Sequence, residues 1–236
     1  MVLVGGQSLT AWVEYYKIPL PPFEDPYLTA DADFRGTKRE AEAIARFLGG
    51  KFEAPEMGDS TPNAAIVVFT GERGEKLNID ILTGVLGVPD AAVKKLAIPL
   101  AIDGCEPIQV LHPLLVLESR CANLLTLRHK RESNGITQAR VACEVVARYL
   151  DECLADPKRK REALKATKRI AALAKKEAGT FVWKEWGIDV MSAVDQSKMP
   201  QPFGRSWAYD KKEVARKREI ATRPPKPKSK RKSPTP

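Results

Sequence analysis

Two apolar segments of strand length, separated by a short polar turn, constrain the fold of this chain more than any other feature. Residues 64–70 (AAIVVFT) and 76–82 (KLNIDIL) flank the sequence GERGE, a pattern that predicts a β-hairpin. Residues 2–6 and 27–34 predict two further strands, and apolar residues at helical spacing dominate beyond Gly135. The sequence therefore predicts an α+β fold in which a small mixed β-sheet precedes a C-terminal helical bundle.

The same pattern divides the chain into a mixed core over residues 1–111, a helical region over 112–210 and a basic tail over 211–236. The tail has 11 basic and 2 acidic residues, which accounts for the whole net charge of +9. Its end, TRPPKPKSKRKSPTP, is too polar and too rich in proline to bury a core, so we expect it to be disordered. Such an arm either binds RNA through its charge or only keeps the chain soluble.

Composition argues against several classes of protein. No apolar run approaches the ~20 residues needed to cross a bilayer, so we expect no membrane association. The opening residues MVLVGG lack the charged leader of a secretory signal. The chain has four cysteines without CxxC spacing and only two histidines, which favours reduced thiols over a zinc site. We therefore expect a cytoplasmic protein.

Acidic residues on two of the expected strands form a candidate metal site. Asp31 and Asp33 share one face of their strand because successive side chains alternate, and Asp80 shares a face with Asn78. If the two strands pair, the three carboxylates converge and would repel one another unless they bind a cation or a proton. Mg²⁺, or Mn²⁺, accepts such hard oxygen ligands together with phosphate oxygens.

A glycine turn near the N-terminus is a candidate phosphate-binding segment. Gly5 and Gly6 lead from an apolar strand into an amphipathic helix expected over residues 8–17. Glycine allows close approach of the backbone to a phosphate, and the N-terminus of a helix favours an anion. Ser8 lies near that N-terminus.

The order of these motifs resembles the polymerase-β-like nucleotidyltransferase superfamily. The matching pattern is an apolar strand with GGxS, then DxD on a strand, then a single acid on a later strand. The abortive-infection type, often the toxin of a bacterial toxin–antitoxin pair, is the most similar branch. That branch has a basic residue before the third acid, as Lys76 is here, and a helix similar to residues 112–132. The resemblance covers about residues 1–150.

The resemblance implies a role for each motif residue. The implied catalytic residues and metal ligands are Asp31, Asp33 and Asp80, and the implied nucleotide contacts are Gly5, Gly6, Ser8, Lys76 and Arg120. Arg120 stands near the position of a family lysine, and Ser133-Asn134 replace an acidic end that the family carries. The implied reaction is Mg²⁺-dependent transfer of a nucleoside monophosphate from an NTP to an acceptor hydroxyl.

Several alternatives remain open at this point. The acceptor is a tRNA, a protein side chain or a small molecule, and an antitoxin is a further expected partner. A second hypothesis is a catalytically silent nucleotidyltransferase fold that binds nucleic acid or a protein, and a third is an unrelated α/β protein. The basic helix expected over residues 158–178 contacts an RNA backbone or is simply solvated. The aromatic residues Phe181, Trp183 and Trp186 are expected to pack on the bundle.

Overall fold

The structure is a computed structural model. It describes residues 1–19, 32–56, 58–59, 61–101, 106–132, 134–201 and 203–223. Several sequence-based expectations lie outside these ranges: most of the loop over 18–26, the first half of the strand with Asp31, Cys105, and the tail beyond Arg223.

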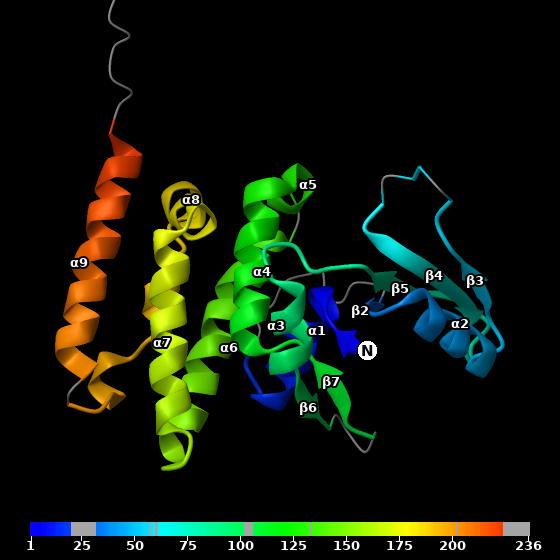
Figure 1. The fold of residues 1–236 in the computed structure, drawn as a ribbon, viewed down its shortest axis with the longest axis horizontal. Helices are drawn as coiled ribbons and strands as arrows, with labels where there is room; N and C mark the ends of the chain where they lie inside the picture. The colour runs from blue at the N-terminus through cyan, green and yellow to red at the C-terminus, as the bar shows by residue number, and fades with distance from the viewer. Residues whose placement is uncertain are drawn as a thin grey trace, which may run out of the picture.

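The described residues form a mixed sheet and a set of helices, which confirms the predicted α+β class (Figure 1). The sheet has the strand order β3-β4-β5-β2-β1-β7-β6. Its strands are β1 Val2–Leu3, β2 Ala32–Arg35, β3 Lys51–Glu53, β4 Asn63–Thr70, β5 Lys76–Leu82, β6 Ile98–Leu100 and β7 Ile108–Val110. The helices are α1 Gly5–Tyr15, α2 Lys38–Phe47, α3 Asp90–Leu96, α4 Pro113–Thr126, α5 Arg128–Arg131, α6 Gly135–Ala155, α7 Lys160–Lys175, α8 Glu177–Trp186 and α9 Phe203–Thr222, with short 3-10 turns η1 Val190–Ala193 and η2 Gln196–Lys198.

Local signals start and stop the elements as the sequence predicts. Thr37 caps α2 through a capping box with Glu40, and Gly49 follows the helix with φ +61°. Pro113 occupies the first turn of α4, where its missing N–H costs nothing. The predicted hairpin of β4 and β5 is antiparallel and pairs Val67 with Ile79.

Two boundaries differ from the sequence-based ones. β1 ends at Leu3 and α1 begins at Gly5, so the glycines open the helix instead of preceding it. At the other end, α9 runs to Thr222 and therefore includes the first part of the segment expected to be a tail. Val214 is buried within this segment, so α9 packs on the rest of the molecule beyond residue 211.

Two hydrophobic clusters hold the described residues together. The larger one joins β1, β7 and α1 to the helices α4, α6, α7 and α8. The smaller one lies between α2 and the hairpin of β4 and β5, at one end of the molecule in Figure 1, with α9 at the other end. As expected, Phe181 and Trp186 pack against the larger cluster, and their rings meet edge to face. The guanidinium of Arg218, from α9, stacks on Trp183. Within the described ranges, no helix combines the length and apolar content needed to cross a membrane.

Candidate active site

The pairing of β2 with β5 brings two of the predicted acids together. The strands are parallel, and Asp33 lies directly opposite Asp80 in their register. Paired residues on adjacent strands point to the same face, and the strands are about 4.8 Å apart. Both side chains line one cavity of about 510 Å³. The structure therefore brings Asp33 and Asp80 to a common site, whereas Asp31 lies outside the described residues.

The cavity is bounded by the sheet on one side and by helices on the other. Its described lining comes from the start of α1, from β2 and β5, from the loops beside them, and from α4, α5 and α6. The residues are Val4, Gly5, Gly6, Asp33, Pro62, Asn63, Asp80, Leu82, Gly84, Val85, Leu86, Ser119, Arg120, Asn123, Leu127, His129, Lys130 and Gln138.

Gly5 packs directly against Asp33. The backbone N–H of Val4 donates to the Asp33 carbonyl at 2.8 Å, which holds the start of α1 beside β2. A Cβ atom on Gly5 would lie only 1.7 Å from Asp33 Oδ2, and Gly5 has φ +61°. Both the close approach and the left-handed backbone require glycine at this position. The glycine turn thus places the N-terminus of α1 next to a carboxylate of the site.

Arg120 is the buried cation of the cavity. Its side chain is only 6 % exposed, and its Nη1 donates to Gln138 Oε1 at 2.9 Å. Its Nε has no hydrogen-bond partner among the described residues. Burial lowers the pKa of Arg120 to about 10 and the charge of Asp33 opposes this shift, so Arg120 stays protonated at neutral pH. A buried donor without a partner costs free energy that an anionic ligand would recover.

Two of the predicted nucleotide contacts do not reach this cavity. Ser8 is fully buried and its hydroxyl donates to the Gly5 carbonyl at 2.9 Å. Because α1 begins at Gly5, Ser8 lies one turn inside the helix and not at its N-terminus. Lys76 opens β5, about 13 Å from Asp80 at the usual rise per residue. It lines a different surface, beside Gly50 and Asn78.

Sequence reasoning missed several polar residues of the site. Asn123 and Lys130 line it from α4 and α5, Gln138 from α6, and Asn63 from the start of β4. The spacing of Arg120, Asn123 and Leu127 was a usable signal, because residues three to four apart share one face of a helix. Asn63 and Gln138 carried no such signal, since only tertiary packing brings them to Arg120 and Asp80.

The donor set of the cavity suits a hard divalent ion. Two adjacent carboxylates, completed by water and phosphate oxygens, are a usual ligand set for Mg²⁺ and an acceptable one for Mn²⁺. Within the described part of the chain, no group of three or more His, Cys, Asp or Glu side chains is placed to hold a metal. The predicted three-carboxylate site would therefore need Asp31 as its third ligand. With Asp33 and Asp80 alone, phosphate oxygens of the substrate would complete the coordination of the ion.

Comparison of the chain with protein-family models and with curated proteins gives no match. The resemblance to nucleotidyltransferases thus stays a prediction from the motifs, and the geometry of the cavity is the independent observation that bears on function.

Proposed function

We propose that this protein is a metal-dependent nucleotidyltransferase and that the cavity lined by Asp33, Asp80 and Arg120 is its active site. One observation carries the proposal: the paired carboxylates face the same cavity as the glycine-opened end of α1 and a buried arginine whose Nε has no hydrogen-bond partner among the described residues. This set provides ligands for a cation and donors for a polyphosphate in one cavity. The proposal keeps the substrate class expected from the sequence, a nucleoside triphosphate.

The charged groups of the cavity divide into two functions. Asp33 and Asp80 hold the cation, with Asp31 expected to join them. A bound Mg²⁺ would screen the phosphate charge and stabilise the oxygens that attack and leave the α-phosphorus. Arg120 and Lys130 contribute positive charge at the helical wall, where they neutralise the triphosphate. The first-turn amides of α1 add partial positive charge beside Gly5.

The transfer itself is a displacement at phosphorus. The acceptor hydroxyl oxygen forms a bond to the α-phosphorus, and the bond between that phosphorus and the αβ-bridging oxygen breaks. Pyrophosphate leaves with the bonding electron pair, and the hydroxyl proton passes to the carboxylate of Asp80. In this scheme Asp80 would orient the acceptor hydroxyl as well as accept its proton. Val85, Leu86 and Leu127 form an apolar part of the wall that suits a base or ribose.

Calorimetric titration with ATP, CTP, GTP and UTP, with and without Mg²⁺ or Mn²⁺, tests the proposal. We expect the wild type to bind at least one triphosphate only when the metal is present. Asp33→Asn and Asp80→Asn should each weaken this binding by about tenfold or more, because each removes a metal ligand. Asp59→Asn is the matched control, since Asp59 is an exposed aspartate that does not line the cavity.

Turnover is measured by incubation with labelled triphosphates and total RNA or protein. Label transfer that Asp80→Asn abolishes and Asp59→Asn retains supports the enzyme. Triphosphate binding that is indifferent to metal and to both acid substitutions would remove the basis of the proposed site.

A further inference from the structure

A second cavity, of about 640 Å³, lies at the other end of α4. Its described lining comes from α3, β6, the first turn of α4, α6 and α7. The residues are Lys95, Leu96, Ile98, His112, Leu114, Tyr149, Arg161, Glu162, Lys165, Ala166 and Arg169. None of them lines the candidate active site, which begins further along α4 at Ser119.

The floor of this cavity is a hydrogen-bond chain that runs from the uncharged imidazole of His112 through Tyr149 to the carboxylate of Glu162. His112 Nδ1 accepts from the backbone N–H of Leu114 at 3.2 Å, so the proton of the ring lies on Nε2. That Nε2–H donates to Tyr149 Oη at 3.0 Å, and the tyrosine hydroxyl donates to Glu162 Oε1. Burial lowers the pKa of His112 to about 4, which keeps the imidazole uncharged at neutral pH. The floor thus contributes no net positive charge.

Two of the charged lining residues are already paired. Glu162 pairs with Arg159, whose Nε lies 3.0 Å from Glu162 Oε2. Arg169 pairs with the buried carboxylate of Glu118 through two bonds, of 2.6 and 2.8 Å. Arg159 also pairs with Glu152, so that group keeps one net negative charge, whereas the pair of Glu118 and Arg169 has none.

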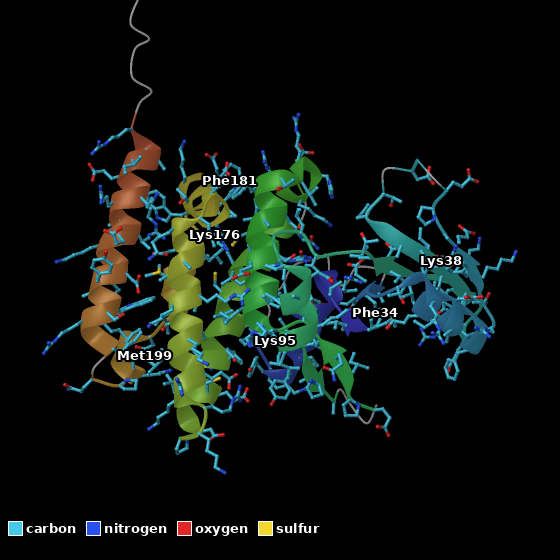
Figure 2. The ribbon with its side chains drawn as sticks, viewed as in Figure 1. Phe34, Lys38, Lys95, Lys176, Phe181 and Met199 are labelled. Carbon is cyan, nitrogen blue, oxygen red and sulfur yellow. The ribbon has the colours of Figure 1, made fainter. Side chains whose placement is uncertain are left out.

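Three cations are left over. Lys95, labelled in Figure 2, stands at the C-terminal end of α3, and Arg161 and Lys165 lie on α7. All three are exposed, and no described carboxylate forms an ion pair with them. Arg161, Lys165 and Arg169 follow one another at four-residue spacing, so they form a row along one face of α7 with steps of about 6 Å.

We propose that this cavity binds the phosphodiester backbone of a single-stranded nucleic acid. A row of cations along one helix, faced by Lys95 from another, matches a chain of successive phosphates better than it matches a single anion. The uncharged His112 and Tyr149 of the floor suit contact with a sugar or base, while the cations lie beside them on α3 and α7. This assigns the basic face of α7 to a ligand, whereas the sequence alone favoured a solvated face.

Fluorescence anisotropy with a labelled single-stranded RNA tests the proposal in the full chain and without any NTP. A failure of the proposed transfer reaction therefore cannot affect the result. The cavity variant carries Lys95→Gln, Arg161→Gln and Lys165→Gln. The matched control carries Lys160→Gln, Lys176→Gln and Lys184→Gln, which remove three exposed charges outside the cavity. Both variants keep the basic tail, so its contribution is the same in each.

We expect the cavity variant to bind RNA more than tenfold more weakly and the control variant to stay within about threefold of wild type. The slope of log affinity against log salt should fall by about 2 in the cavity variant, because each lost phosphate contact removes about 0.7. Lys165→Arg, which keeps the charge, should retain affinity. Single-stranded DNA of the same sequence shows whether the site requires the RNA sugar or only the shared backbone.

Equal weakening in the two triple variants would overturn the proposal, since it would indicate diffuse attraction by the whole surface. Unchanged RNA affinity in the cavity variant would overturn it as well. Titration of the same variants with tripolyphosphate gives a small-anion comparison. If the cavity variant lost tripolyphosphate binding but kept its RNA affinity, the cavity would be assigned to a small anion instead. Thermal melting of each variant, followed by circular dichroism, checks that the fold is intact. We expect it to be intact because all six substituted residues are exposed.

Discussion

Gly5 is the residue at which backbone conformation and the proposed chemistry are most closely joined. It has the left-handed φ that opens α1, and its α-carbon faces the carboxylate of Asp33. Any larger residue there must either move Asp33 or displace the start of the helix. Gly49 provides a natural comparison, because it has the same φ of +61° but no atom within 4 Å of its missing Cβ.

Gly5→Ala should therefore cost more than Gly49→Ala. We expect Gly49→Ala to lower the free energy of unfolding by about 1 kcal/mol, the usual cost of a left-handed alanine. Gly5→Ala should lose more than this, because it adds the collision with Asp33, and it should abolish metal-dependent triphosphate binding. Urea unfolding and calorimetric titration measure the two effects. Equal stability losses and equal NTP binding in both variants would contradict the role of this contact.

At the scale of elements, the chain of His112, Tyr149 and Glu162 ties together three helices. His112 caps α4, Tyr149 comes from α6 and Glu162 from the first turn of α7. Arg159 stacks over the Tyr149 ring and holds the pKa of Glu162 below its usual range through their hydrogen bonds. The three helices are therefore joined by hydrogen bonds with defined donors and acceptors, in addition to apolar packing.

This network predicts a loss of stability in mild acid. The pKa of His112 is about 4 in the folded chain and 6.5 in the unfolded one, so the unfolded state binds the proton more readily as the pH falls below about 6.5. Between pH 7.5 and pH 5 this should remove about 2 kcal/mol of stability. His112→Asn keeps an acceptor for the Leu114 N–H but does not titrate.

The measurement is urea unfolding of wild type and His112→Asn at both pH values. Groups that titrate elsewhere affect both proteins equally, so the difference between them isolates the imidazole. We expect the wild type to lose about 2 kcal/mol more than the variant. The same loss in both proteins would show that the folded His112 is protonated as easily as the unfolded one.

At the scale of the whole molecule, the two separate hydrophobic clusters should differ in local stability. The smaller cluster is built largely from small side chains, among them Ala41, Ala45 and Ala65. The larger cluster includes Trp12, Tyr149 and many leucines of the helices. Less apolar area is buried per residue around α2 and the β4–β5 hairpin, so that part should open more easily.

Hydrogen exchange followed by mass spectrometry tests this division. Amides of α2, β3 and β4 should exchange through openings that cost roughly 2 kcal/mol less than those that expose α4 and α6. Under the proposed function, Mg²⁺ with a bound triphosphate should raise the opening free energy of β5 towards that of α4 and α6, because the ligand bridges Asp80 to Asp33. Identical opening free energies in both parts would show that the chain unfolds as one unit.

Much of the local structure followed from the sequence alone. The hairpin of β4 and β5, the capping box of Thr37 and Glu40, and the start of α4 at Pro113 all depend on residues within a few positions of one another. Such signals act through backbone geometry and nearby hydrogen bonds, so they hold whatever the rest of the chain does. The overall α+β class follows from the same patterns.

The candidate site was decided by tertiary structure. The sequence allowed Asp33 and Asp80 to meet but did not require it, because their strands pair only when β2 packs between β1 and β5. The partnership of Arg120 with Gln138, the inward position of Ser8 and the second cavity around Lys165 also arise from packing of distant segments. The chain itself determined which helices and strands could form, because those choices involve neighbours. Which side chains meet was decided by the burial of apolar faces over the whole fold, and that free energy is shared among residues far apart in the sequence.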